Sequence, residues 1–326
     1  MRKTIATPKQ KAQKKFNKAF DIADGVSFGQ MQHGYLYLKY FDLYIYKMRQ
    51  SLGAFLPDGP DAVRPEREIH EDIEALIDMQ VRHSNTVGRK IETNAYHAKV
   101  MRYEDARKIF HLKDDLNLPN LPKTIIPYEV ARRAIIKSPQ RIINFDCPCR
   151  NTRGEKGCRP RGVCMLLGEP WATWGMENIP DANPRVITQE EALKIIEEQR
   201  DMGNVQSAFF KDACGDRLYA LCNCCSCCCV AMASLNYANI PTFAKSGYII
   251  ASDIDKCIGC GICEKSCHFF ACKVKDGKVD IDHPKCYGCG VCVKACPKDA
   301  LRLELDDPSV SAPLDLSVLA PECLKD

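Results

Sequence analysis

A cysteine pattern that occurs twice near the C-terminus constrains this chain more than any other feature. The first copy is Cys257, Cys260, Cys263 and Cys267, and the second copy is Cys286, Cys289, Cys292 and Cys296. Each reads C-x2-C-x2-C-x3-C, a spacing that wraps three corners of one iron–sulfur cubane. Zinc sites instead pair two short C-x2-C elements across a longer loop. The repeated register therefore predicts two [4Fe–4S] clusters rather than a zinc or disulfide framework.

The fourth cysteine of each copy is expected to bind the cluster of the other copy, because it points away from its own three neighbours. Glycines beside the ligands permit the tight curl, since glycine adopts positive φ and lets amide N–H groups approach the sulfides. We therefore expect two ligand sets. The first cubane set is Cys257, Cys260, Cys263 and Cys296, and the second cubane set is Cys286, Cys289, Cys292 and Cys267.

From Cys257 to about Leu305 the chain resembles the bacterial two-[4Fe–4S] ferredoxin domain. The two copies differ after their last cysteine, where Pro297 follows one and His268 follows the other. We expect His268 to be solvated rather than to take part in redox chemistry. Cys272 aligns with Leu301 of the second copy, so an apolar packing role is expected for it. Residues 273–281 alternate around Asp-Gly and predict a hairpin.

The cysteines are confined to one part of the chain, and this distribution indicates metal clusters. The chain has 326 residues and 21 cysteines, with none before Cys147. This usage indicates a reducing, anaerobic cytoplasm and not secreted disulfides. Neither a secretory signal nor a long unbroken apolar run is evident, so no transmembrane segment is expected. The net charge of +4 gives no case for nucleic acid.

A second cysteine segment reads C-x-C-x8-C-x5-C and follows a predicted strand at 141–145. Its four members are Cys147, Cys149, Cys158 and Cys164. Nearby arginines lower thiol pKa values and offset the negative charge of a thiolate-bound cluster. We therefore predict a third [4Fe–4S] cluster here, with zinc as the alternative. The arginines expected to support that cluster are Arg150, Arg159 and Arg161.

A third segment holds six thiols within the eight residues from Cys222 to Cys229. Neighbouring side chains diverge, so the run suggests ligands shared between two clusters, or one cluster that is not a cubane. Some members are expected to be apolar fillers without metal. The predicted ligands are Cys222, Cys225 and one of the last three cysteines, for which Cys228 is chosen. A buried helix is expected to begin at Val230, and its N-terminus would favour an anionic cluster.

The remaining pattern predicts that the N-terminal part of the chain, positions 1–140, is largely helical. Helices are expected over Gln30–Arg49, Arg67–Val81, Tyr103–Leu112 and Tyr128–Lys137. A further helix is expected over Thr188–Met202, where Thr188 and Glu191 form a capping box and Gly203 follows the end.

The order of the cysteine segments, C-x-C-R, then C-N-C-C-x-C-C-C, then two ferredoxin runs, resembles a group of 4Fe–4S binding proteins of anaerobic bacteria and archaea. The resemblance spans roughly Ile125 to Leu305 and implies electron transfer through several clusters.

We expect an α+β chain with four parts. These are a helical docking or oligomerisation region (1–122), a mixed cysteine-rich cluster-binding domain (123–250), a two-[4Fe–4S] ferredoxin-type domain (251–305) and a C-terminal tail (306–326). The expected function is a relay of single electrons to or from a partner redox enzyme through two [4Fe–4S] clusters and one or two further iron–sulfur clusters. The alternative is an iron–sulfur reductase whose central cluster, near Cys222–Cys229, binds substrate. The helical region could also pair two copies of the chain.

Overall fold

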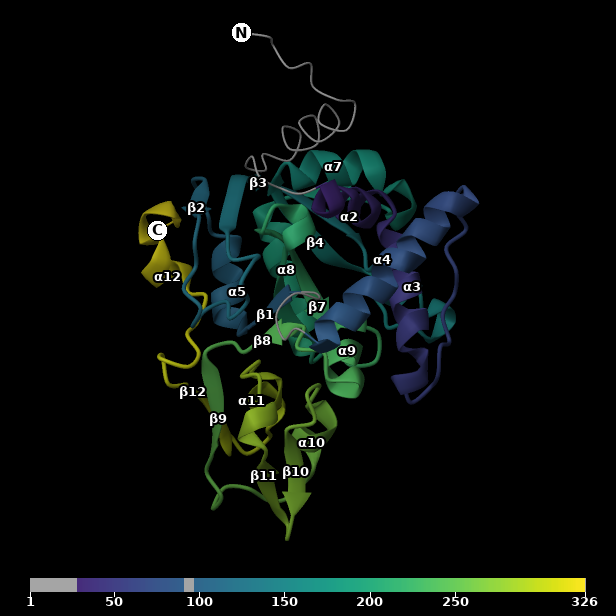
Figure 1. Cartoon of the computed structure of the whole chain (residues 1–326). Coiled ribbons are helices and arrows are strands. Elements are labelled where there is room, and N and C mark those ends of the chain that lie inside the picture. Colours follow the sequence, from purple (N-terminus) through teal and green to yellow (C-terminus); the bar gives the residue numbers. More distant parts are fainter. Residues whose placement is uncertain (1–27, 91–96, 326) are drawn as a thin grey trace.

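The computed structural model describes residues 28–90 and 97–325 and has the expected α+β architecture (Figure 1). One large sheet forms the centre, helices cover both of its faces, and a smaller unit carries the repeated cysteine pattern. Among the described residues, no helix is both long enough and apolar enough to cross a membrane.

The α-helices of the described residues are spread along the chain and lie around the sheets. They are α2 (Phe28–Lys39), α3 (Phe41–Leu52), α4 (Glu71–Lys90), α5 (Tyr103–Ile109), α6 (Pro148–Asn151), α7 (Trp171–Asn178), α8 (Gln189–Asp201), α9 (Val230–Ala238), α10 (Ile262–Ser266), α11 (Val291–Ala295) and α12 (Leu316–Leu319).

The strands form one sheet of eight and two ribbons of two. They are β1 (His97–Met101), β2 (Leu116–Leu118), β3 (Ala134–Asp146), β4 (Gly162–Glu169), β5 (Arg185–Ile187), β6 (Val205–Lys211), β7 (Arg217–Cys224), β8 (Phe243–Ala244), β9 (Tyr248–Ser252), β10 (Cys272–Lys275), β11 (Lys278–Ile281) and β12 (Leu301–Leu305).

The large sheet has the order β2-β3-β4-β7-β6-β1-β8, with β5 paired to β3. Its pairs are antiparallel except for β1 with β8. Successive residues face opposite sides, so Phe209 packs with α2, α3, α7 and α9, whereas Phe210 packs with α5, α8 and α12. Both faces are buried.

The N-terminal part of the chain is less helical than expected, because β1, β2 and the start of β3 lie before position 140. The helix predicted over 128–137 is wrong. Ala131 has a φ of 59°, outside the helical region, and Ala134 onward extends as β3, where Ile135 and Ile136 pack in the sheet as β-branched residues favour. Within β3, Pro139 lies where the pairing with β4 shifts register between Lys137 and Ile142.

The other expected elements are present with shifted ends. The segment Gln30–Arg49 forms two helices that break at Tyr40, and the helix expected from Arg67 begins at Glu71. The hairpin at 273–281 is β10–β11, and a helix does begin at Val230. The chain after β12 returns over α5, where Asp315 forms an ion pair of 2.6 Å with Lys108.

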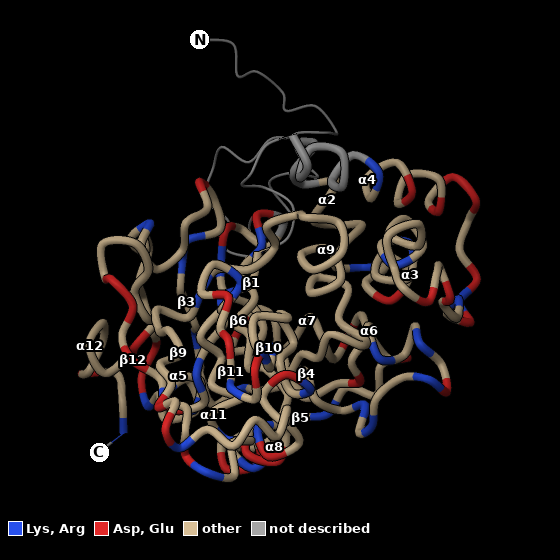
Figure 2. Tube along the Cα trace, turned by 90° about the horizontal axis from the view of Figure 1, so that it is seen from below, with Lys and Arg blue, Asp and Glu red and all other residues tan. Residues whose placement is uncertain are grey.

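The smaller unit lies below the large sheet in Figure 1 and contains β9–β12, α10 and α11. The antiparallel pair β9–β12 connects it to the end of β8 and to the C-terminal segment. Seen from this side, acidic and basic residues are interspersed around α8, α11 and β11 (Figure 2).

The capping box at α8 gives a direct test of how this helix is held. Thr188 Oγ1 accepts a hydrogen bond from the Glu191 N–H at 3.1 Å, and the Glu191 carboxylate accepts from the Thr188 N–H at 2.9 Å. Thr188→Ala removes one of these bonds and is expected to lower the free energy of unfolding by about 1 kcal/mol. Thr188→Ser keeps the hydroxyl and should cost much less. Anaerobic denaturant unfolding measures both, and equal losses would contradict this assignment.

Candidate metal centres

The first cubane set lines a single cavity in the smaller unit. Cys257, Cys260 and Cys263 surround about 380 Å³ of space free of protein atoms, and Cys296 of the other copy faces the same space. In the second set, burial raises the pKa of the Cys289 thiol to about 12, and the nearby thiols of Cys267 and Cys286 add to this. Both arrangements agree with the crossed assignment, which remains a proposal about ligation.

Backbone amides already point at sulfurs of both sets. The N–H groups of Ala271 and Ala300 donate to the Sγ atoms of Cys267 and Cys296, at 3.2 and 3.3 Å. Such bonds stabilise thiolates and tune clusters. Glycine is required at one point of this curl, since a Cβ on Gly288 would lie 2.0 Å from the carbonyl oxygen of Tyr248.

A four-thiol group lies beyond the end of β7. Its members, whose Sγ atoms all lie within 4.8 Å of one another, are Cys158, Cys225, Cys227 and Cys228. The Sγ of Cys227 is 3.0 Å from that of Cys158 and 3.0 Å from that of Cys225. Four thiolates are the number of ligands that one [4Fe–4S] cluster or one zinc ion takes.

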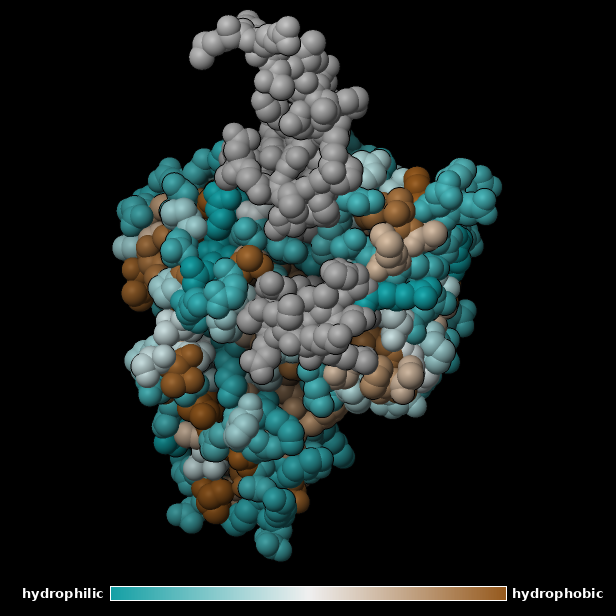
Figure 3. Space-filling model, in the orientation of Figure 1, coloured by the Kyte–Doolittle hydropathy of each residue, from teal (hydrophilic) through white to brown (hydrophobic). Residues whose placement is uncertain are grey.

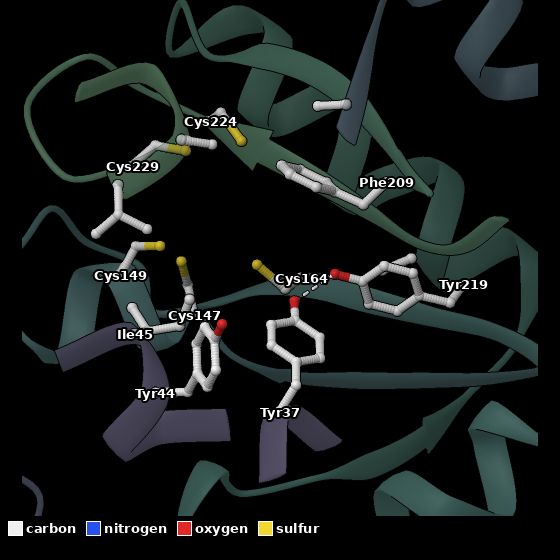
Figure 4. Packing of buried hydrophobic residues seen from close by; sticks show 14 of the residues in the cluster. Tyr37, Tyr44, Ile45, Cys147, Cys149, Cys164, Phe209, Tyr219, Cys224 and Cys229 are labelled. Atoms are coloured by element: carbon white, nitrogen blue, oxygen red, sulfur yellow. Dashed lines mark hydrogen bonds between the residues drawn. The ribbon is translucent and has the colours of Figure 1, made fainter. Parts of the chain in front are cut away.

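A six-thiol cavity lies deeper in the same region. Figure 4 shows the sulfurs of Cys147, Cys149, Cys164, Cys224 and Cys229 facing a common space, with Phe209 and Tyr219 at one side. This space is about 510 Å³ with its opening to solvent included, and it also borders Cys225 and Cys228 of the four-thiol group. The six cysteines of this cavity are Cys147, Cys149, Cys164, Cys222, Cys224 and Cys229.

Strand geometry explains how the cysteine segments come together. β4 pairs with β7 in a register that sets Met165 opposite Leu221. Continuing this register places Cys164 opposite Cys222. Cys222 and Cys224 are two residues apart on β7, so both side chains face the same side of the sheet. The turn after β7 sends the next cysteines toward Cys158.

The structure places the central cysteines in groups that differ from the expected ones. Of the loop Cys147–Cys164, Cys158 lies in the four-thiol group and the other three line the six-thiol cavity. The predicted triad of Cys222, Cys225 and Cys228 is divided in the same way. Sequence reasoning missed Cys224, Cys227 and Cys229. Both segments contain C-x-C, at Cys147–Cys149 and at Cys222–Cys224, and this shared spacing could have indicated that Cys224 belongs with the first segment.

The predicted arginines occupy different places. Arg150 is buried between the two thiol groups and donates to the carbonyl oxygens of Pro160 and Asn223. Burial lowers the pKa of Arg150, whereas several nearby thiolates, led by Cys147, raise it. Together the thiolates outweigh burial, so the pKa is raised. Arg159 is exposed, and the Arg161 side chain donates to the carbonyl oxygen of Gly154. Only Arg150 of the three supplies buried positive charge between the thiols.

Each thiol group has one member that ionises first. Hydrogen bonds from Cys225 and Cys227 lower the pKa of Cys228 to about 2. In the cavity, hydrogen bonds from Cys149 and Cys164 hold the pKa of Cys147 well below its usual range. A metal bound at either group would require the remaining thiols of that group to lose their protons as well.

His268 is not solvated, contrary to the expectation. Its Nε2 lies 2.8 Å from the carbonyl oxygen of Gly203, and its Nδ1 lies 3.2 Å from the backbone N of Ser226. Burial lowers the pKa of this histidine. Cys272 is buried beside Ile250 and Leu301, and the thiols of Cys267 and Cys292 lie near its own.

Comparison with known proteins identifies one part of the chain. Residues 256–300 match the model of the 4Fe-4S dicluster domain. Neither a curated protein nor a solved structure matches the chain significantly. The chain therefore contains a domain of the 4Fe–4S dicluster type, and the central cysteines are interpreted from their own geometry.

Crossed ligation makes a specific prediction for Cys296. Cys296→Ala should remove the cluster bound by Cys257, Cys260 and Cys263, with loss of about four irons, and leave the other cubane. Anaerobic iron analysis and EPR of the reduced protein measure this. Cys272→Ala serves as the control and should retain both clusters. Loss of the second-copy cluster alone in the Cys296 variant would contradict the crossing.

The regrouped central cysteines make another prediction. Cys158→Ala and Cys227→Ala should remove the same EPR signal and about four irons each, although the two residues come from different segments. Cys164→Ala should leave that signal in place. A shared loss for Cys158 and Cys164 would show that the grouping is wrong, and zinc instead of iron at the four-thiol group would overturn the iron assignment.

Proposed function

We propose that this protein relays single electrons between an outside redox partner and iron–sulfur clusters in its central region. The dicluster domain and the central thiol groups support iron–sulfur electron transfer. The relay requires that the dicluster domain and the central clusters be in close, fixed contact. The single observation that carries the proposal is the hydrogen-bonded contact of His268 with Ser226.

His268 directly follows Cys267 of the second cubane set, and Ser226 lies between Cys225 and Cys227 of the four-thiol group. The Ser226 N–H can only donate, so Nδ1 of the imidazole accepts. Nε2 then carries the proton and donates to the Gly203 carbonyl. The neutral imidazole thus connects the ligand segments of two proposed clusters. His268 and Ser226 are each next in sequence to a predicted ligand.

A second contact runs through aromatic rings. Tyr287, beside Cys286, stacks on Phe269 with ring centroids 4.5 Å apart, and Phe269 lies 6.0 Å from Phe243. Phe243 lies 6.2 Å from Phe209, which lines the six-thiol cavity. This packed series keeps the dicluster domain and the cavity in a fixed relation and excludes water between them.

The opposite end of the relay reaches the surface. Cys260 of the first cubane set is exposed, whereas Cys286 and Cys292 of the second set are buried. Beside Cys260, Ile258 is 60 % exposed. Figure 3 shows apolar surface on this lower part of the molecule. We propose that the outside partner exchanges electrons at the first cubane.

Removing the imidazole tests the relay. His268→Ala should slow reduction of the central clusters after rapid reduction of the dicluster domain, as measured by anaerobic stopped-flow absorbance. Iron content should be unchanged. The lost hydrogen bonds leave the Ser226 N–H and the Gly203 carbonyl unsatisfied, so the free energy of unfolding should fall by about 1–3 kcal/mol.

His283→Ala is the matched control, because His283 is an exposed histidine of the same domain. That variant should transfer electrons at the wild-type rate. Equal rates in the wild type and the His268 variant would contradict the proposed path.

A reductase is the second candidate. It is favoured by a larger cavity of about 1240 Å³ that shares Phe41 and Pro148 with the wall of the six-thiol cavity. A small substrate could approach the central thiols from that side. A substrate that reoxidises the reduced protein in repeated turnovers and changes a central EPR signal would favour this function over the relay.

A further inference from the structure

We propose that the six-thiol cavity holds one iron–sulfur cluster with more than four irons, distinct from the cubane proposed at the four-thiol group. This inference rests on the proposed function, since it takes the central thiols to be iron ligands. It concerns which thiols act together and how much metal they can hold.

The six thiols line one common cavity. Continuing the register of β4 with β7 places Cys164 opposite Cys222. Cys222 and Cys224 are two residues apart on β7 and face the same side of the sheet. Figure 4 shows the sulfurs of Cys147, Cys149, Cys164, Cys224 and Cys229 around the same space.

The six thiols come from two segments that contribute three each. Cys147 directly follows β3, Cys149 lies in α6 and Cys164 lies in β4. Cys222 and Cys224 lie in β7, and Cys229 directly precedes α9. The first two cysteines of each segment are spaced C-x-C. The two triads line the same cavity, and Figure 4 shows five of the six sulfurs around it.

This number of thiolates exceeds what one cubane or one zinc ion uses. A [4Fe–4S] cubane takes four terminal cysteines, one for each iron, and structural zinc also takes four. Two thiols would be left over in a buried cavity in either case. Two four-iron halves that share a sulfide contain eight irons, and six thiolates serve all eight when two of them bridge an iron of each half and four bind one iron each. The two triads supply this arrangement.

The space and its lining fit a larger anionic cluster. The space beside the six thiols, with its opening to solvent included, is about 510 Å³, compared with about 380 Å³ on the same measure beside the first cubane set. Phe145, Phe209 and Tyr219 form an apolar wall that limits access of water. Positive charge is present as well, because Arg150 lines the cavity and Cys229 caps the N-terminus of the nine-residue helix α9.

Iron stoichiometry of the full-length protein tests the proposal. The wild type, purified anaerobically, should contain about 20 irons per chain, against about 16 if the six thiols hold a single cubane. Cys224→Ser should lose about eight irons, and Cys158→Ser in the four-thiol group should lose about four. Native mass spectrometry under anaerobic conditions measures each loss.

Cys214→Ala is the matched control, because Cys214 is a fully buried cysteine of the same core whose described charged surroundings are Lys211, Asp212 and Arg217 rather than other thiols. It should retain all of the iron. If Cys224→Ser does not fold, anomalous scattering at the iron edge from wild-type crystals counts the irons in the cavity directly. Four irons, zinc or no metal in the cavity would overturn the proposal.

The same samples separate this inference from the relay. The effect of His268→Ala on electron transfer depends on the four-thiol group and not on the number of irons in the cavity. A cavity with four irons and an intact His268 effect would overturn only the larger cluster. A normal iron count with no His268 effect would overturn only the relay.

Discussion

The antiparallel pairing of β4 with β7 is the constraint on which the central sites depend. It joins two strands that are far apart in the chain and sets Cys164 beside Cys222. Without this pairing, the loop after β3 and the turn after β7 would have no reason to meet. Both thiol groups contain residues from each segment, so the sheet register determines which cysteines act together.

The sequence pattern predicted correctly those features that are contained in one short segment of the chain. The repeated cysteine register predicted the dicluster domain, and the Asp-Gly hairpin and the α8 capping box were also predicted correctly. These features are each contained in a short segment, so tertiary contacts had little opportunity to override them. The helix expected over 128–137 failed because its isoleucines are used in a sheet, and only long-range pairing selects between those states.

The grouping of the central cysteines could not be predicted from spacing. Cys147 and Cys158 are close in sequence but enter different groups, and Cys158 finds its partners in the distant turn after β7. Within 222–229, strand geometry sends Cys222 and Cys224 to the cavity, and the turn sends Cys225, Cys227 and Cys228 away from the strand. His268 was misjudged for the same reason, since its partners Gly203 and Ser226 lie in distant segments.

The molecule thus has thiol groups arranged from an exposed first cubane set, through a buried second set and His268, to the central region. A stoichiometric reductive titration under anaerobic conditions, monitored by EPR, tests this account most directly. A dicluster domain alone takes up about two electrons. The account predicts that each chain takes up more than this number, and that EPR signals of the central clusters appear in equilibrium with those of the dicluster domain. Uptake of about two electrons, with no signal lost when Cys158 or Cys224 is replaced, would contradict it.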